Sequence, residues 1–413
     1  MATQEAQERR RVVVTGIGAI SALGFSAQEN FQNLVDGKTG LSSLPFEHPT
    51  IKLAGQIKNF DLKTVFSAFD DKRLKETNRL PRAAQIGQAA MQEALQSADL
   101  LDDHSLLKDP SVAEDFPVYQ ATAIGGGFDL DILEGKSKIH IIQTLPDTVA
   151  SGPGRIFGLR GTYLTPMAAC AGGGEAIGIA FRFIRDGYND IAIAGGAESG
   201  ITPRHIDQYD QIHALSLSDD PERASLPFDV DASGFVMAEA GAALILESEE
   251  HAVRRGAQIL AEVKWFESGS DAYHPTSGDG SALRKTMRRV RKVLGEVDGA
   301  LFVQAHATGT KGDLVEGKVI EKVLEDDREK VVYAYKRRTG HPLGVAGVYG
   351  AFVTIYTLNE GVVPPNNVEH PVKEFAFELP REAVQRKFAA GMSNSLGFGG
   401  DTNTLGFVPY VPR

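Results

Sequence analysis

The sequence predicts an α/β protein with mostly parallel sheets, built from two similar halves. Apolar runs of strand length alternate with stretches of helical periodicity along most of the 413 residues. Both halves show the order strand, glycine turn, helix, which indicates a degenerate duplication of a half-size unit. The 44 glycines cluster where strands end, as is typical of tight strand-to-helix corners.

The first half is predicted to span residues 11–255, after a charged, flexible tail over 1–10 that has no apolar core and is therefore no secretory signal. A β-branched run that ends at glycines predicts the first strand, and an alanine-rich periodic segment predicts the first helix. Strands are expected at 11–17, 119–124 and 190–194, a strand pair or one long bent strand at 234–247, and helices at 79–100 and 175–185. The polar, proline-bearing stretch 201–233 is expected to be an irregular surface excursion.

The second half is predicted to span residues 256–413, and it repeats the alternation of short apolar strands with amphipathic or apolar helices. Strands are expected at 300–305, 331–335, 388–392 and 404–408, and helices at 315–324 and 344–358.

Composition excludes several classes of protein. A net charge of −11 argues against a general nucleic-acid binder. No apolar run approaches the roughly 18–20 residues of a membrane span, so membrane insertion is not expected. A single cysteine forbids an intramolecular disulfide and a thiolate metal cluster, which favours a reducing cytoplasm. No zinc-binding histidine spacing occurs, so we expect no metal.

That single cysteine, Cys170, lies in the string PMAACAGGGEAIGIA, where small residues and a glycine run precede a helical segment. The start of a helix favours a thiolate, and its free N–H groups are able to hold an oxyanion. Cys170 is therefore a candidate nucleophile. The alternative is a buried structural thiol, since free cysteine is among the most buried residue types.

Two histidines and a lysine complete the candidate catalytic set. His306 follows an apolar strand and precedes carboxylates that are able to orient its imidazole; the alternative is a turn histidine that caps a helix. Lys336 ends an apolar strand, where functional residues are common in open α/β sheets, and His341 follows five residues later in a glycine turn. The basic run between them is also typical of a solvated face. A nucleophile and two histidines are the groups that acyl transfer needs.

The segment 397–400, Gly-Phe-Gly-Gly, has unusual backbone freedom. Such a turn lets the main chain approach a ligand closely, but a plain hairpin explains it equally well.

Taken in order, these strings resemble a β-ketoacyl-[acyl-carrier-protein] synthase of the elongating, condensing type, with the thiolase fold. The resemblance runs nearly end to end. It is carried by VVVTGIGAISALG at 12–24, FGLRG at 157–161, ACAGG at 169–173, AGGAE at 194–198, PFD at 227–229, GFV at 234–236, SDAYH at 270–274, the two histidine motifs, VPP at 363–365 and NSLGFGG at 394–400. It implies a duplicated five-layer α-β-α-β-α core and a homodimer.

The resemblance also implies a two-stage reaction. Cys170 would take an acyl chain from a carrier-protein thioester. His306 and His341 would then bind a malonyl thioester, assist loss of carbon dioxide and stabilise the enolate that attacks the acyl group. Lys336 would support them. No cofactor is implied, because phosphopantetheine arrives on the carrier protein.

Further residues acquire roles by the same resemblance. The backbone N–H groups of Cys170 and Phe398 would form the oxyanion hole, with Asp313 and Glu316 as supporting carboxylates. The residues expected to contact the pantetheine arm are Thr276, Thr308 and Thr310. An acidic acyl carrier protein would dock by charge on a basic run. The residues predicted for this docking are Lys72, Arg73, Lys75, Arg79, Arg82 and Arg204. The alternative for this run is solvated surface, the commoner fate of clustered charges.

The chain departs from the family pattern at several places. It is one residue shorter between His306 and Asp313 and one residue longer after Gly400. These departures leave a non-catalytic or specialised subunit of a ketosynthase heterodimer as an alternative. The complete Cys-His-His set argues against an inactive subunit. A coenzyme A thiolase is disfavoured, because thiolases use a second cysteine as base.

Overall fold

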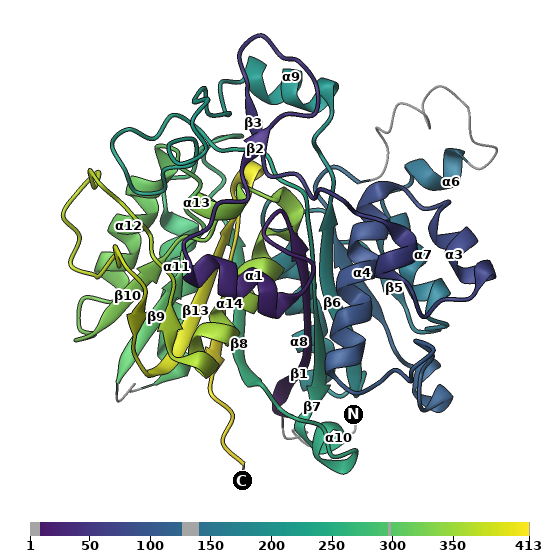
Figure 1. Cartoon of the computed structure of the whole chain (residues 1–413). Coiled ribbons are helices and arrows are strands. Elements are labelled where there is room, and N and C mark those ends of the chain that lie inside the picture. The colour runs from purple at the N-terminus through teal and green to yellow at the C-terminus, as the bar shows by residue number, and fades with distance from the viewer. Residues whose placement is uncertain (1–8, 126–139, 296–298, 413) are drawn as a thin grey trace.

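Strands from both halves of the chain join in one ten-stranded sheet in the computed structural model, which describes residues 9–125, 140–295 and 299–412 (Figure 1). The first half supplies β1 (Val12–Ser21), β4 (Val118–Ala121), β5 (Tyr163–Leu164), β6 (Ile191–Glu198) and β7 (Ala240–Ser248). The second half supplies β8 (Ala261–Ser270), β9 (Ala300–Gln304), β10 (Lys330–Tyr333), β13 (Phe388–Leu396) and β14 (Asp401–Val408). Two small ribbons lie apart from this sheet: β2 (Ser42–Ser43) with β3 (Leu53–Ala54), and β11 (Val362–Val363) with β12 (Val384–Gln385).

The two halves of the sheet have the same topology. The strand order is β10-β9-β13-β14-β8-β1-β7-β6-β4-β5, so each half places its first strand at the joint and its third strand at the outer edge. The directions also match, because β4 pairs in parallel with β5 and β6, as β9 does with β10 and β13. The halves meet where Val12–Val14 pair with Ala261–Val263. The chain is therefore a structural duplication, as its sequence predicts.

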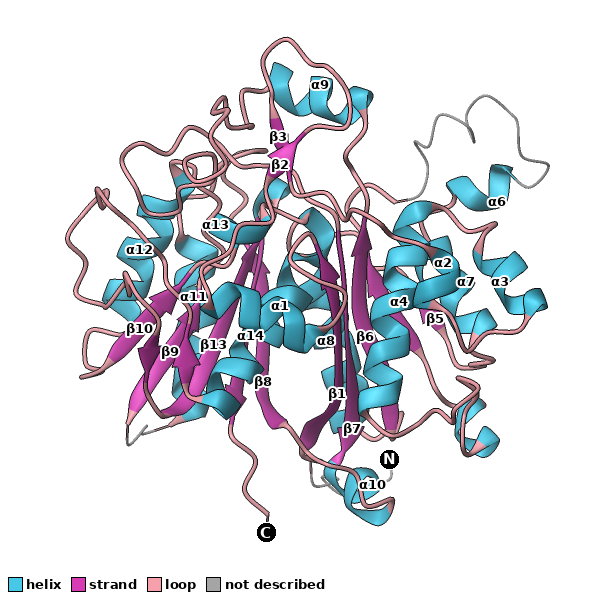
Figure 2. Cartoon of the chain, in the orientation of Figure 1, coloured by secondary structure: helices cyan, strands magenta, loops and turns pink. Residues whose placement is uncertain are grey.

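The two half-sheets form two layers of the fold, and helices form three more (Figure 2). The six layer helices are α4 (Arg82–Ser97), α7 (Thr148–Ile156), α8 (Gly172–Arg185), α11 (Ser281–Leu294), α12 (Gly312–Val323) and α14 (Ala346–Glu360). The pair α4 and α7 covers the outer face of the first half-sheet, and α11 covers that of the second. The helix α12 packs beside α11, and its Val319 and Ile320 belong to the same core cluster as Val303 of β9. The pair α8 and α14 lies between the half-sheets and contacts strands of both. This is the α-β-α-β-α arrangement.

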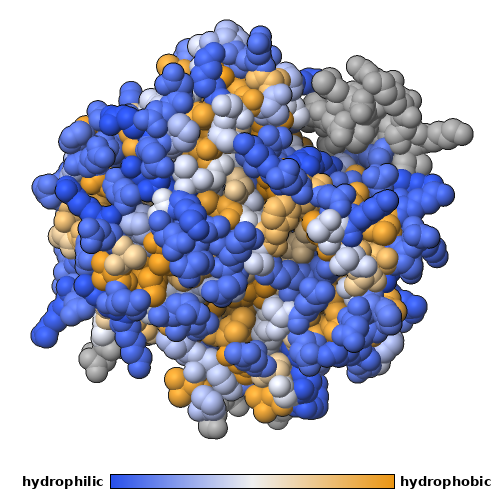
Figure 3. All heavy atoms as spheres, in the orientation of Figure 1, coloured by the Kyte–Doolittle hydropathy of each residue, from blue (hydrophilic) through white to orange (hydrophobic). Residues whose placement is uncertain are grey.

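Shorter helices decorate this core. They are α1 (Ala27–Val35), α2 (Leu62–Val65), α3 (Asp71–Thr77), α6 (His140–Thr144), α9 (Pro203–Gln211), α10 (Glu249–Arg254) and α13 (Lys336–Thr339), with 3-10 turns at Pro110–Ala113, Leu343–Val345 and Phe398–Gly400. Hydrophilic residues cover most of the face shown in Figure 3. Within the described residues, no helix is both long and apolar enough to cross a membrane.

The central helices approach each other closely because glycines line their contact. A methyl group added at Gly347 of α14 would lie 2.2 Å from the backbone nitrogen of Gly174 in α8. One added at Gly173 would lie 2.8 Å from the nitrogen of Val348. Glycine is the residue that such main-chain contact requires. The glycine run after Cys170 thus brings α8 against α14, whose first turn follows His341.

The expected mostly parallel sheet is wrong, because the sheet is mixed. The strands β7 and β14 run antiparallel to both of their neighbours. The hairpin over 397–400 joins β13 to β14 without a crossover helix, and a tight turn of this kind imposes antiparallel pairing. The segment 234–247 is neither a strand pair nor one long strand. It forms β7 from Ala240 onward, and only isolated bridges occur over 234–239.

Other expectations differ in extent. The predicted tail over 1–10 falls largely outside the described residues, and Arg10 forms an ion pair with Asp190. The excursion 201–233 is less irregular than expected, because it contains α9 and buries Ile206 and Phe228. The strand β8 and the helix α11 were not expected from the sequence, and both precede β9, the first strand predicted in the second half.

Candidate active site

Cys170 lies on a tight turn between β5 and α8. Ala169, the preceding residue, has a φ of +45°, and the N–H of Ala171 donates to the carbonyl of Ala168 over 2.9 Å. The turn rests against Gly397, where a Cβ would lie 2.7 Å from the carbonyl oxygen of Ala168. The strained turn therefore presents the sulfur at the start of α8, with the 397–400 hairpin directly beside it.

His341 occupies the corresponding place in the second half, just before α14. Its Nε2 lies 3.1 Å from the Sγ of Cys170. Its backbone is fixed by two hydrogen bonds, from its N–H to the carbonyl of Val236 (2.7 Å) and from the N–H of Ala238 to its carbonyl (3.1 Å). The duplication therefore sets a thiol and an imidazole in contact at the starts of the two paired central helices.

His306 follows β9 and faces the same space. Its ring centroid lies 5.3 Å from that of His341, and the two rings are inclined at 85°. The backbone N–H of His306 donates to the carboxylate of Glu316 over 2.8 Å, and the next N–H, of Ala307, donates to the other oxygen over 2.8 Å. Glu316 thus fixes the main chain that carries the second imidazole.

Lys336 is buried beneath the histidines, and its ammonium group donates to the carbonyl oxygen of His306. Burial lowers the pKa of Lys336, while the charge of Glu316 raises it. Asn394 also donates to Glu316, over 3.2 Å. Lys336 therefore acts on the imidazoles through a backbone contact and through its charge.

Asp313 closes the shortened loop after His306. Its carboxylate accepts from the N–H groups of Thr308 (2.9 Å), Gly309 (3.0 Å) and Phe228 (3.0 Å). Burial raises the pKa of Asp313, and these three amides lower it. Asp313 therefore fixes the main chain of the loop that follows His306.

The thiol of Cys170 differs in protonation from the sequence expectation. Burial raises its pKa to about 12, although the charge of Lys336 and the N–H groups of Cys170 and Phe398, which face the sulfur, act in the opposite direction. The expected thiolate at the helix start is wrong for the unliganded chain, because desolvation outweighs the helix start. The thiol of Cys170 is therefore neutral near neutral pH.

Both imidazoles are neutral near neutral pH. Burial, followed by the positive charge of Lys336, lowers the pKa of His306 and His341 well below the usual range. A neutral imidazole has one nitrogen that donates and one that accepts a hydrogen bond. The pair can therefore accept a proton from the thiol and donate to an oxygen of a bound ligand.

These groups open into one cavity of about 680 Å³. Its lining includes Cys170, His306, His341, Phe398, Asp313, Glu316, Thr276, Thr308 and Thr310. Lys336 is the one predicted catalytic residue that lies outside this lining. The 397–400 segment is both the turn of a β-hairpin and part of the cavity wall, so the two interpretations of its glycines do not exclude each other.

The predicted docking run does not form one exposed basic surface. Arg73 donates to the carbonyl oxygens of Ser105 (3.0 Å) and His104 (2.7 Å). Arg82 is bound to the carboxylate of Glu239 over 2.6 and 2.8 Å. These two arginines hold the fold together. The remaining members are exposed: Lys72, Lys75, Arg79 and Arg204.

Sequence reasoning missed Glu198, a buried carboxylate behind the site. It accepts from the N–H groups of Ala123 (2.7 Å) and Gly344 (3.2 Å), and burial raises its pKa to about 7. It thereby ties the loop after β4 to the turn after His341. Its signal was present in the AGGAE string, which was used only as part of the resemblance. The surface excursion 201–233 also contributes to the site in a way the sequence did not predict, because its residues Tyr209 and His213 line the cavity.

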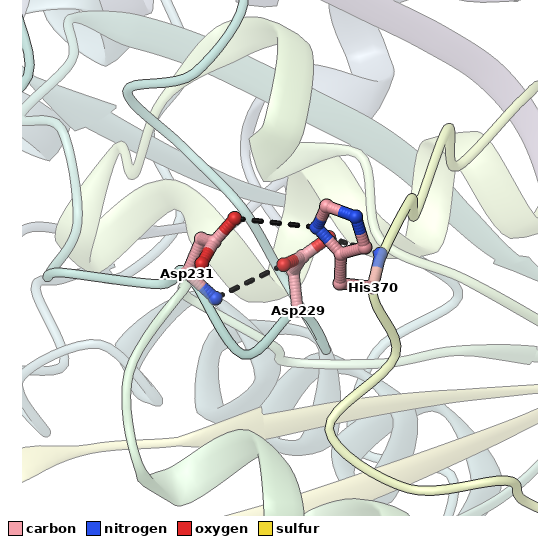
Figure 4. Close-up of side chains that lie close together, drawn as sticks. All are labelled: Asp229, Asp231 and His370. Carbon is pink, nitrogen blue, oxygen red and sulfur yellow. Dashed lines mark hydrogen bonds and ion pairs between the residues drawn. The ribbon is translucent and has the colours of Figure 1, made fainter.

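Asp229, Asp231 and His370 form another cluster of possible metal ligands, with ligand atoms within 4.8 Å of one another (Figure 4). Hydrogen bonds within the cluster use these atoms. Asp229 accepts from the backbone N–H groups of Asp231 and His370, both over 3.0 Å, and Asp231 forms an ion pair with Arg223. We assign the cluster a structural role in joining two surface segments.

Nearly the whole chain matches known proteins. Residues 9–252 match the Beta-ketoacyl synthase, N-terminal domain family, and residues 260–368 match the Beta-ketoacyl synthase, C-terminal domain family. The 3-oxoacyl-[acyl-carrier-protein] synthase 2 of Synechocystis sp. is 33% identical over 426 residues, covering 98% of this chain and 99% of the relative. The enzyme of the same name from Vibrio cholerae is 33% identical, covering 97% and 99%.

Solved structures agree with the sequence relatives. The ishigamide ketosynthase/chain length factor superposes with a TM-score of 0.85 at 27% identity, covering 98% of this chain and 100% of that chain. A type II polyketide synthase acyl-carrier protein in complex with its ketosynthase superposes with a TM-score of 0.84 at 25% identity, with the same coverage. Family models, sequence relatives and solved structures match the chain over nearly its full length, and the chain belongs to the β-ketoacyl synthase family.

Proposed function

We propose that the chain is an acyltransferase that catalyses decarboxylative condensation of an acyl group with a malonyl group, both carried on acyl carrier protein, in fatty-acid or polyketide chain elongation. The observation that carries the proposal is the contact of 3.1 Å between Cys170 Sγ and His341 Nε2, with the His306 ring beside it in one cavity. This set can perform both stages of the reaction.

In the first stage, His341 accepts the proton of Cys170 as the sulfur attacks the carbonyl carbon of the acyl thioester. A new carbon–sulfur bond forms, the bond to the pantetheine sulfur breaks, and the departing thiolate takes the proton. The N–H groups of Cys170 and Phe398, which face the sulfur, stabilise the oxyanion of the intermediate.

In the second stage, the malonyl carbon–carboxylate bond breaks, carbon dioxide leaves, and the electron pair of that bond forms an enolate. Neutral His306 and His341 donate hydrogen bonds to the enolate oxygen. The enolate carbon attacks the acyl carbon, a carbon–carbon bond forms, and the bond to Cys170 breaks. Cys170 leaves as a thiolate and takes a proton from solvent, which restores the thiol. Lys336 contributes by holding the main chain of His306 and keeping both rings uncharged.

The chain supplies these groups itself, and we propose that it uses no metal or cofactor of its own, the phosphopantetheine arm arriving on the carrier. Thr276, Thr308 and Thr310 line the cavity and are suited to hydrogen-bond that arm. The single cysteine excludes a disulfide within the chain, which favours a reducing cytoplasm, and we propose this compartment.

We further propose that the chain functions as a dimer. The outer strand β5 has a partner strand on one side only among the described strands. Exposed apolar side chains lie near it, because the ring of Phe183 contacts Tyr188 and also Tyr119, which pairs with Leu164 of β5. They are Leu164, Met167, Phe183 and Tyr188. A second copy of this chain is the occupant we favour. A ketosynthase paired with a chain length factor, as in one structural relative, is the alternative.

The proposed reaction is tested by mass spectrometry of the purified chain with acyl carrier protein that bears a labelled acyl group. We expect an acyl adduct on Cys170, and release of carbon dioxide with a β-ketoacyl product once malonyl carrier is added. Cys170→Ala should form no adduct. His306→Asn should still form the adduct and lose condensation. Condensation by Cys170→Ala at the wild-type rate, or no adduct on the wild-type chain alone, would contradict the proposal.

A further inference from the structure

Helix α11 carries an unusual concentration of positive charge. It has six basic residues and no acidic residue among 14, in a chain whose net charge is −11. The basic residues are Arg284, Lys285, Arg288, Arg289, Arg291 and Lys292. A field of one sign on an oppositely charged protein is a feature that attracts a charged partner.

Most of this charge faces solvent without a partner. The helix buries Leu283, Met287 and Val290 in the core of the second half. Two of its basic residues are neutralised: Arg289 pairs with Glu267, and Arg291 with Asp327. The other four are exposed and have no ion pair among the described residues: Arg284, Lys285, Arg288 and Lys292. Three of these, at positions 284, 288 and 292, fall on one row of the helix.

This row begins at the entrance of the catalytic cavity, because residues 276–278, which line the cavity directly before α11, are exposed. Gly280, the cap of α11, and Leu283 in its first turn line the cavity that contains Cys170. Exposed Lys311, before α12, lines the same cavity and extends the positive surface. From there the helix runs about 20 Å away across the surface, at about 1.5 Å per residue.

A hollow in the surface lies farther along the helix. It has a volume of about 450 Å³ and is lined by Arg288, Arg291, Lys292, Gly295 and Val323. The cations in this lining, together with apolar Val323 of α12, suit an acidic protein surface with an apolar contact point.

We infer that the exposed face of α11, together with Lys311, is the docking surface for an acidic carrier protein. The inference rests on the proposed function, since the carrier must present its pantetheine arm to the cavity at which α11 begins. Charge complementarity selects an acidic protein, and the helix gives it a continuous positive row from the entrance outward. The run over 72–82 is poorer in this respect, because Arg73 and Arg82 are bound internally.

The test compares Arg288→Glu/Lys292→Glu with the matched reversal Lys72→Glu/Lys75→Glu on α3. Turnover is measured with acyl and malonyl groups on acidic acyl carrier protein, and with the same groups on free pantetheine, at low and high salt. The α11 reversal should lower kcat/KM for the carrier substrates on the order of tenfold or more at low salt, since charge steering changes association rates by 10–10³. The α3 reversal should change it little, and neither should affect pantetheine substrates.

Several results would overturn the inference: equal loss with pantetheine substrates, loss from the α3 reversal alone, or no loss from either. Loss of binding to anionic vesicles or RNA in the α11 variant, with carrier turnover unchanged, would assign the surface to another partner. The neutral variant Arg288→Gln/Lys292→Gln should show a smaller loss in the same direction, and wild-type pantetheine turnover in each variant shows that it folds. If wild type condenses neither substrate, the proposed function itself fails.

Discussion

The reactivity of the site depends on a balance between burial and polar contacts at single residues. Cys170 lies at a helix start and near Lys336, both of which favour its thiolate, yet burial prevails and leaves the thiol neutral. The same burial keeps His341 neutral and therefore able to accept the proton. A thiol that ionises only as it reacts is protected from oxidation between turnovers, because the thiolate is the susceptible form.

We expect alkylation of Cys170 by iodoacetamide to be slow at neutral pH and to rise steadily from about pH 6 to about pH 10. The folded pKa is about 12, so the reactive thiolate fraction grows with pH throughout this range. The chain has no other cysteine, so adduct mass reports this residue alone. The unfolded chain serves as control and should level off above its ordinary thiol pKa. A folded-state rate that is constant from about pH 6 would instead reveal a thiolate–imidazolium pair.

At the residue scale, the sequence predicts which residues form the site better than it predicts their protonation states and internal contacts. Cys170, His306, His341 and Phe398 were recognised from motifs and do meet in one cavity. The protonation of the thiol was predicted wrongly, because desolvation depends on residues distant in sequence that close over it. Arg73 and Arg82 show the same limit, since their internal partners lie far along the chain.

At the scale of elements, the site depends on how closely two helices approach. Cys170 lies just before α8, and His341 lies shortly before α14. The separation of the two helix starts therefore sets the distance between the sulfur and the imidazole. Gly347 contacts the main chain of α8 so closely that no side chain fits. The glycines at this contact are thus required for the two helices to hold the sulfur and the imidazole close together.

Gly347→Ala should destabilise the fold and nearly abolish condensation. The added methyl group would lie 2.2 Å from the nitrogen of Gly174 and 2.8 Å from its Cα, so the helices must separate. Overpacking of this kind costs about 1–3 kcal/mol, and a shift of the imidazole removes the base from the thiol. Thermal unfolding and condensation rate measure the two effects. Gly269→Ala on β8, where a methyl group meets nothing within 4 Å, is the control. Wild-type stability and rate in Gly347→Ala would contradict this account.

Elements were predictable where their own residues decide them. The apolar run at 300–305 and the small-residue helix near 175–185 formed close to the predicted positions. The antiparallel direction of β7 and β14 was not predictable from local pattern, because it follows from chain connections across the whole sheet. Helix α11 was missed although Leu283, Met287 and Val290 have helical spacing, since its many charges masked the apolar face.

At the scale of the whole molecule, the duplication leaves two outer sheet edges with different surroundings. The edge at β10 is covered, because the backbone of Glu378 exchanges hydrogen bonds with Lys330 and Val332. The edge at β5 has no such cover among the described residues, and an unpaired strand edge readily pairs with another chain. The asymmetry points to β5 as the place where a second subunit binds.

The dimer proposed for this edge is tested by Leu164→Lys/Tyr188→Lys. These side chains are 43% and 75% exposed, so the isolated subunit should fold, but two buried lysines would oppose a contact across β5. Sedimentation velocity should show the wild type at twice the chain mass and the variant at the chain mass. Val253→Lys on α10, an equally exposed apolar site away from the edge, should remain dimeric. A wild-type chain that sediments alone, and dimerises only with a second ketosynthase-like chain, would replace the homodimer with the heterodimer. Dimers retained in the edge variant would place the interface elsewhere.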